Sequence, residues 1–318
     1  MSRLRIGTRA SKLALWQTEH VRARLHAAGI ETERIEIKTT GDLVQHVPLA
    51  EIGGRALFTR QIDEAMLEGR IDLAVHSLKD LPTTLPEGIA LVAVGEREDP
   101  RDALVGRGPI RWNDLPRGGV VATSSLRRRA QLLHLRPDLE VRDVRGNVDT
   151  RLSKLEASQD WSAILLAAAG LVRLGLEARI GERLSPAVML PAPGQGALAV
   201  TARAGDHTAA SAVARAVHHP STARAVAAER AFLRTLEGGC QVPVAAHATL
   251  RGDRLHLHGR VVSLRGERAV EGEDTSEVRD EQEADGLGAR LAERLLAEGA
   301  SSILAEVRSA AAPVVPEP

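Results

Sequence analysis

The chain has 318 residues, 43% of them hydrophobic, so it can bury substantial cores and has the length of about two or three domains. Its 42 basic and 42 acidic residues cancel to a formal charge of zero, which argues against a general nucleic-acid binder. The single cysteine, Cys240, excludes an intramolecular disulfide framework. No apolar run could span a bilayer and the start has no signal-like apolar region, so we expect a cytoplasmic protein without a membrane partner.

The first two-thirds of the chain alternates between strand and helix patterns, as is typical of a layered α/β protein. The pattern of the first unit predicts strands at 4–7, 34–39, 71–78 and 89–94, with helices that begin after Ser11 and around Ile62. The second unit repeats this pattern, with strands at 120–123, 140–144 and 164–168 and helices at 126–135 and 148–157. With a return strand at 198–201, the two units suggest a hinged body of two lobes. Ligands of open α/β sheets lie beyond the carboxyl ends of the strands, so we expect a cleft between the lobes.

The last third of the chain has a different pattern. Ser221 can cap a helix that runs to about Glu237, where two glycines stop it. Strand-like stretches follow at 242–250 and 255–263, and a later helix has leucines spaced for one apolar face, at 287, 291, 295 and 296. This pattern predicts a smaller α+β domain.

Cationic and hydroxyl side chains gather where predicted strands end. The candidates for an anion site are Arg9, Ser11, Lys79, Thr123, Ser124, Ser125, Arg127, Arg128, Arg145 and Arg151. Helix starts offer free N–H groups to anions, and the guanidinium fork pairs with a carboxylate through two parallel hydrogen bonds. Any one of these arginines could instead lie on a solvated helix face or in a surface ion pair. The whole set at several strand ends favours a shared site.

Two further residues have alternative interpretations. Asp80 follows a predicted strand, where it could stabilise a cation in the cleft, or simply pair with Lys79 or cap a helix. Cys240 follows two glycines, so a loop could present its thiol to the cleft, but a lone cysteine is usually a buried small hydrophobe. The residues alone favour the buried interpretation for Cys240. No pattern in the sequence supports a metal or a nucleotide cofactor.

Several motifs resemble those of the hydroxymethylbilane synthase (porphobilinogen deaminase) family. In chain order they are Thr-Arg-Ala-Ser at 8–11, His-Ser-Leu-Lys-Asp at 76–80, Arg-Glu-Asp-Pro-Arg-Asp at 97–102, Thr-Ser-Ser-Leu-Arg-Arg at 123–128, Arg-Gly-Asn-Val at 145–148, Gly-Gln-Gly-Ala at 194–197 and Glu-Gly-Gly-Cys-Gln-Val-Pro at 237–243. They run in family order from about residue 5 to residue 243, so the resemblance does not depend on any single motif.

The resemblance implies an activity and a cofactor. The family joins four porphobilinogen molecules head to tail, releases ammonia at each step and hydrolyses the product to hydroxymethylbilane, the linear precursor of tetrapyrroles. A dipyrromethane cofactor is attached by a thioether to the cysteine that matches Cys240, which reverses the interpretation drawn from the residues alone. The resemblance also implies a small-molecule substrate and a monomer, and the neutral charge argues against a nucleic-acid partner.

The resemblance assigns roles to the candidate residues. Asp80 matches the family's central catalytic group. The cofactor-binding set is Cys240, Lys79, Thr123, Ser124, Ser125, Arg127, Arg128, Arg145 and Gly146. The substrate-binding set is Arg9, Ser11, Arg145, Arg151 and Gln195, and Gln195 is also expected near the hinge.

The family fold has two lobes like those of periplasmic binding proteins and a smaller α+β domain. It implies a first domain at 1–95 plus 197–214, a second at 100–190 and a third at 218–318. The chain departs from the family pattern at Lys12, where many members have proline, at Ala56, where glycine is common, and at Asp149.

Two competing functions fit parts of the sequence. A two-lobed solute-binding or ligand-sensing protein would use the same lobes and arginines but would need neither Asp80 nor an accessible Cys240. A nucleic-acid-binding module could use Arg127, Arg128 and Arg129, but the neutral charge and an aromatic content of 2% argue against it.

Overall fold

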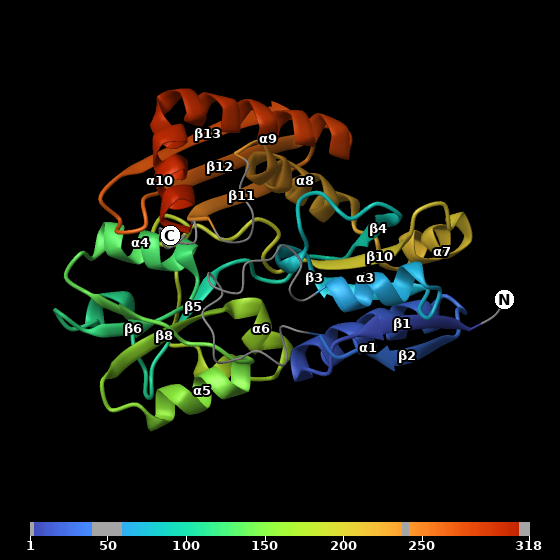
Figure 1. Ribbon diagram of the computed structural model, residues 1–318, viewed down its shortest axis with the longest axis horizontal. Helices are drawn as coiled ribbons and strands as arrows, with labels where there is room; N and C mark the ends of the chain where they lie inside the picture. The colour runs from blue at the N-terminus through green and yellow to red at the C-terminus, as the bar shows by residue number, and fades with distance from the viewer. Residues whose placement is uncertain (1–2, 40–58, 237–241, 312–318) are drawn as a thin grey trace, which may run out of the picture.

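The computed structural model describes residues 3–39, 59–236 and 242–311. Within these ranges the strands form three sheets, which divide the molecule into two lobes and a C-terminal domain. Figure 1 shows the C-terminal domain above both lobes, which lie side by side. The predicted α/β class with two sheet-containing lobes and a smaller α+β domain is confirmed.

The first lobe has a five-stranded sheet in the order β2-β1-β3-β10-β4. Strand β1 pairs in parallel with β2 and β3, whereas β10 pairs antiparallel with β3 and β4. The apolar side chains of β1, β3 and β10 pack against α1 and α7 in a common core. The elements of this lobe are β1 (Leu4–Thr8), α1 (Lys12–Ala27), β2 (Thr32–Glu36), α3 (Arg60–Leu67), β3 (Leu73–Ser77), η1 (Leu78–Asp80), β4 (Ile89–Val94), β10 (Leu198–Arg203) and α7 (His207–Val217).

The second lobe has a five-stranded sheet in the order β7-β6-β8-β5-β9. Strand β6 pairs in parallel with β7 and β8, and β5 runs antiparallel to β8 and β9. Apolar side chains on the two faces of this sheet belong to separate clusters. The elements of this lobe are β5 (Asp102–Val105), η2 (Trp112–Asp114), β6 (Val120–Ala122), α4 (Leu126–Leu135), β7 (Glu140–Arg142), α5 (Val148–Ala157), β8 (Trp161–Ala167), α6 (Ala168–Arg173), η3 (Glu177–Arg179) and β9 (Glu182–Arg183).

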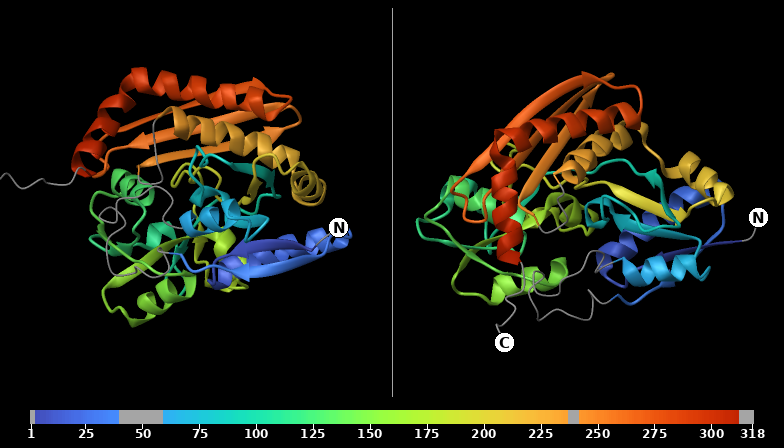
Figure 2. Two further views of the ribbon diagram at one scale, coloured as in Figure 1. Left: turned by 45° about the vertical axis from the view of Figure 1, so that its right-hand side comes forward. Right: turned by 45° about the horizontal axis from the view of Figure 1, so that its top comes forward.

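The C-terminal domain is an antiparallel sheet, β11-β12-β13, with α8 and α9 packed on it. Figure 2 shows these two helices running side by side along the sheet. Phe232 is fully buried against Gly259, where a Cβ atom would lie 2.4 Å from the ring, so only glycine allows this close approach. The elements are α8 (Pro220–Thr235), β11 (Val244–Arg251), β12 (Arg254–Val262), β13 (Ala269–Glu277), α9 (Glu281–Leu295), η4 (Leu296–Ala300) and α10 (Ser301–Ala311).

Some predicted elements differ from the structure in their limits. Helix α8 begins at Pro220 and is capped by the side chain of His219, so the predicted cap at Ser221 is wrong. Proline suits the first helical position because its missing N–H would have no partner there. Strand β13 and helix α7 had no prediction. The domain limits implied by the family resemblance stay predictions.

Two segments connect the lobes, residues 95–101 from β4 to β5 and residues 184–197 from β9 to β10. Glu229 of α8 is fully buried where these segments meet the C-terminal domain. Its carboxylate pairs with Arg97, at 2.6 Å, and accepts hydrogen bonds from the N–H groups of Gly194 and Ala248. One carboxylate therefore connects both segments to the C-terminal domain.

Candidate active site

A cavity of about 280 Å³ lies between the two lobes. The strand ends and helix starts of both sheets line it, as the rule for open α/β sheets predicts. The predicted site residues that line this cavity are Arg9, Ser11, Lys79, Asp80, Ser124, Arg128, Arg145, Gly146 and Arg151. Thr123, Ser125, Arg127 and Gln195 are not among its lining residues. Cys240 and Ala56 lie outside the described residues.

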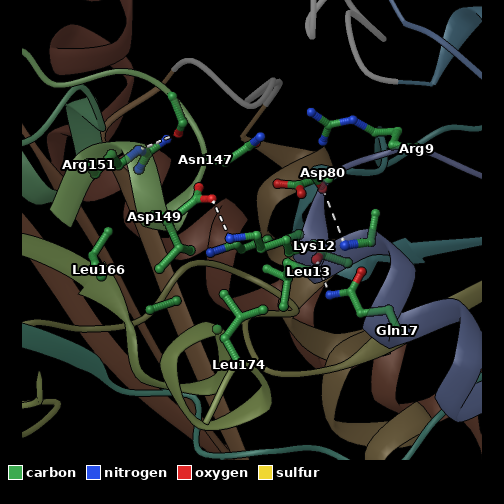
Figure 3. A pocket seen from close by; sticks show the side chains of 18 of the residues that line it. Arg9, Lys12, Leu13, Gln17, Asp80, Asn147, Asp149, Arg151, Leu166 and Leu174 are labelled. Carbon is green, nitrogen blue, oxygen red and sulfur yellow. Dashed lines mark hydrogen bonds and ion pairs between the residues drawn. The ribbon is translucent and has the colours of Figure 1, made fainter. Parts of the chain in front are cut away.

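Each lobe contributes one side of the cavity. Figure 3 shows Arg9, Lys12 and Asp80 of the first lobe facing Asn147, Asp149 and Arg151 of the second. Lys12 reaches across the cavity to Asp149, with 3.2 Å between Nζ and Oδ2. Two of the three positions at which this chain departs from the family pattern therefore form an ion pair with each other. The side chain of Lys12 is largely exposed and that of Asp149 about half exposed, so the pair adds little stability.

The predicted hydroxyl residues hold the backbone around the cavity. Ser11 caps α1 by accepting a hydrogen bond from the N–H of Ala14, at 3.3 Å, and Ser125 caps α4 in the same way. The hydroxyl of Ser124 donates to the carbonyl of Val144 at 2.9 Å and accepts from its N–H at 3.0 Å. Thr123 accepts from the N–H of Ser125 at 3.2 Å. These bonds fix the loops that carry the arginines.

Arg127 and Arg128 are both buried and pair with the same carboxylate, Asp102. The distances to Asp102 are 2.7 Å from Nη1 of Arg127 and 2.7 Å from Nη2 of Arg128. Arg127 also donates to the carbonyl of Leu190, and Arg128 to that of Leu165. Burial alone would raise the pKa of Asp102, but the charges of the two arginines lower it below its usual range. Asp102 thus orients both arginines, and Arg128 still reaches the cavity.

The cavity lining has an excess of positive charge. Burial and the charge of Arg128 lower the pKa of Lys79 to about 8, and burial lowers the pKa of Arg151 to about 10. Atom Nη1 of Arg145 is buried and has no hydrogen-bond partner among the described residues. An unpaired buried donor is unfavourable, so Arg145 is ready to receive an anionic acceptor.

Asp80 is the one carboxylate of the lining that no cation neutralises through a direct ion pair within the described residues, because Asp149 is paired with Lys12. It ends η1, the short turn that follows β3, and its side chain is exposed. The carboxylate is therefore open to a ligand while being surrounded by cations. Such a setting suits the stabilisation of a positive charge that develops on a ligand.

Sequence reasoning assigned no role to some residues that the structure places at this site. Gln17 lines the cavity and donates from Nε2 to Oγ of Ser77 at 2.8 Å. Its position one turn after Leu13 on α1 was the available signal. Asp102 lay within a recognised motif, but its partners are on another element. His76, interpreted as a core histidine, is buried and lies 3.3 Å from the hydroxyl of Thr201.

Among residues 3–39, 59–236 and 242–311, no three His, Cys, Asp or Glu side chains are grouped to hold a metal ion. In the same part of the chain, every helix is too short or too polar to cross a membrane.

Two family models and several relatives match most of the chain. A family model described as "Porphobilinogen deaminase, dipyromethane cofactor binding domain" matches residues 4–211, and one described as "Porphobilinogen deaminase, C-terminal domain" matches residues 223–297. The porphobilinogen deaminase of Geobacter metallireducens is 51% identical over 306 residues, which cover 96% of this chain and 94% of the relative. That of Syntrophotalea carbinolica is 50% identical over 317 residues, 99% of each chain.

Solved structures also resemble part of the chain. A periplasmic substrate-binding protein of an ABC transporter from Coxiella burnetii has a TM-score of 0.44 and 14% identity, and the match covers 69% of this chain and 93% of that one. A nutrient binding protein from Burkholderia cenocepacia has a TM-score of 0.42 and 13% identity, covering 67% and 90% of the two chains. The family models and the close relatives together span almost the whole sequence, and the chain therefore belongs to the porphobilinogen deaminase family.

Proposed function

We propose that this protein is a hydroxymethylbilane synthase, which joins four porphobilinogen molecules head to tail with release of ammonia and hydrolyses the product. The observation that carries the proposal is a cation-rich cavity with one available carboxylate, found in a chain of the porphobilinogen deaminase family. Each porphobilinogen has an acetate and a propionate, which match the cationic lining. The runner-up, a solute-binding protein, accounts for the arginines but leaves Asp80 without a role.

The residues of the cavity fit a dipyrromethane cofactor, which the matching family model names. Atom Nη1 of Arg145 is unpaired and Lys79 is half-buried, so an anionic partner would stabilise both cations. The cofactor has four carboxylates that could serve as such partners. When bound, the cofactor supplies the pyrrole carbon to which the first substrate unit is joined. Cys240 would hold it through a thioether.

The carboxylates would be bound by cations from both lobes. We assign the cofactor carboxylates to Lys79, Arg128 and Arg145, and the substrate carboxylates to Arg9, Arg145 and Arg151. Their guanidinium forks favour two parallel hydrogen bonds to a carboxylate. Ser11, Thr123, Ser124, Ser125 and Arg127 support this set through helix caps, loop bonds and the Asp102 pair. Gly146 supports it through its carbonyl, which accepts from Nε of Arg151 at 2.8 Å.

Asp80 is the residue to which we assign the chemistry. Loss of ammonia from the aminomethyl group of porphobilinogen leaves a cation on the pyrrole, which a nearby carboxylate stabilises. The same carboxylate can accept the proton that leaves the coupling carbon when the new bond forms.

We also propose that the protein acts as a monomer in the cytoplasm, without a nucleic-acid partner. The formal charge of zero supports the last of these points.

The first test of the proposed function is the intact mass of the purified protein, compared with that of Cys240→Ser. We expect the wild-type protein to carry an excess equal to two linked pyrrole units and the variant to lack it. If the wild-type mass is unmodified, incubation with porphobilinogen should add the same excess to an apo-enzyme. A wild-type protein that gains no mass after incubation contradicts the proposal and favours the solute-binding protein.

Arg145→Met should weaken loading without destabilising the fold. Each charge-assisted hydrogen bond lost is worth about 1.5–3 kcal/mol, so we expect KM for porphobilinogen to rise about tenfold or more. The free energy of unfolding should not fall, because the variant removes a buried donor that has no partner among the described residues. Steady-state kinetics and denaturant titration would measure the two effects. An unchanged KM would remove Arg145 from the binding set.

A further inference from the structure

Gln195 is fully buried between the lobes, and its side-chain amide makes three hydrogen bonds. Nε2 donates to the carbonyl of Pro100 at 2.7 Å and to Oδ1 of Asp102 at 3.0 Å. Oε1 accepts from Nζ of Lys79 at 3.1 Å. The two acceptors facing Nε2 determine which way the amide points, so its oxygen must face Lys79.

The backbone of Gln195 is held as firmly as its side chain. Its carbonyl accepts from Nε of Arg97 at 2.9 Å, and that of Gly196 accepts from Nη2 of Arg173 at 2.6 Å. Gly196 has φ +91°, and a Cβ atom there would lie 2.3 Å from the carbonyl oxygen of Glu98. The segment therefore has little freedom to move away from either lobe.

Asp102, to which the Gln195 amide donates, is also held in place. It is fully buried and is held by Arg127 and Arg128, the latter reaching the cavity. Asp102 begins β5 of the second lobe, and Lys79 follows β3 of the first lobe. Among the hydrogen bonds of the described residues, those of Gln195 are the ones that join both side chains, and Gln195 lies in the segment that returns to the first lobe.

We propose that Asp102 and Gln195 form a positioning relay that holds the Lys79 ammonium beside Asp80 and Arg128, and so sets where one carboxylate of the pyrrole ligand binds. The inference rests on the proposed function, since that function supplies the carboxylate. Neither relay residue lines the cavity, so both act through the residues that they orient.

The protonation state of Lys79 depends on charges from three elements. Asp80 lies on its own turn, Arg127 and Arg128 on α4, and Asp102 on β5. Burial and Arg128 lower the pKa of Lys79 to about 8, and the two carboxylates partly oppose this. The ammonium is therefore lost as the pH rises through about 8. Removing the Gln195 acceptor should make this loss occur at lower pH, because a hydrogen bond to the charged form favours it.

The relay can be tested on the purified full-length protein with Gln195→Met. Competitive acetylation of Lys79, followed by mass spectrometry across a pH series, reports the pH of half-maximal labelling. We expect this pH to fall by about one unit, as for the loss of one hydrogen bond to a charged group. KM for porphobilinogen should rise about tenfold, with a smaller change in kcat.

Gln131→Met is the matched control. Gln131 is equally buried and bonds to Leu190 of the same connecting segment, but it makes no contact with Lys79. It should leave the labelling pH and KM near wild-type values. If Gln195→Met does not fold, Gln195→Asn keeps a buried amide but is too short to reach both Asp102 and Lys79, and the same downward shift is expected.

Acetylation of Lys79 requires no turnover of porphobilinogen. The labelling therefore tests the relay independently of the proposed function. A wild-type protein that does not consume porphobilinogen overturns the proposed function but leaves the labelling comparison valid. An unchanged labelling pH in the Gln195 variant, or an equal shift in Gln131→Met, overturns the relay.

Discussion

Asp80→Asn is expected to lower kcat for porphobilinogen consumption by about a hundredfold to ten-thousandfold, the range for loss of a general base or of charge stabilisation. The amide keeps the size of the side chain but can neither accept the proton nor balance the cation left by ammonia. Ammonia release from porphobilinogen measures the rate. The fold should be retained, because Asp80 is exposed at the end of η1.

Asp160→Asn is a suitable control, since Asp160 is also an exposed aspartate but does not line the cavity. It should have a near-normal rate. A near-normal rate of ammonia release in Asp80→Asn would contradict the role assigned to Asp80. Retention of ligand binding together with loss of turnover would instead support it.

Asp102→Ala should lower the free energy of unfolding by about 3–5 kcal/mol, because it leaves two buried guanidinium groups without their counter-charge. Denaturant titration would measure the loss. Activity should also fall, since Arg128 and, through Gln195, Lys79 lose their common partner.

Asp138→Ala provides the contrast, because Asp138 forms a short ion pair with Arg136 at the surface. That variant should lose much less stability, since both side chains are about a quarter exposed and water screens such a pair more than a buried one. The buried cluster also predicts a pH dependence. The lowered pKa of Asp102 contributes stability above its unfolded value of 3.8, and this contribution is lost as the pH falls below that value. If Asp102→Ala and Asp138→Ala lowered the free energy of unfolding equally, burial would not be the cause of the loss in Asp102→Ala.

Elements with strong local signals could be predicted from the sequence. Helices 126–135 and 148–157 have the predicted limits, because each has a cap position followed by an apolar face. Strand β13 was missed because its sequence, Ala-Val-Glu-Gly-Glu-Asp-Thr-Ser-Glu, lacks an apolar alternation. It forms by pairing with β12, a contact that no local pattern encodes.

The sequence predicted most of the residues that line the candidate site, but not the contacts that these residues make with one another. Four of the predicted arginines do meet in one cavity, since strand ends converge at one edge of each sheet; these are Arg9, Arg128, Arg145 and Arg151. The pairing of Arg127 and Arg128 with Asp102 depends on the packing of α4 against β5, which lie about 25 residues apart in sequence. Likewise, the spacing of Gln195 from Lys79 gives no sign that their side chains touch.

The position of β10 in the first sheet has a consequence for the order in which the chain can fold during its synthesis. In that sheet β4 joins its neighbours only through β10, and β10 follows the whole second lobe in sequence. When β4 leaves the ribosome, the edge of β3 that pairs with β10 is still open. It stays unpaired until roughly a hundred further residues have been synthesised. An unpaired strand edge is prone to pair with other chains. The second lobe, by contrast, is continuous in sequence and can fold first, so the nascent first lobe is the stage at which we expect this protein to depend most on chaperones.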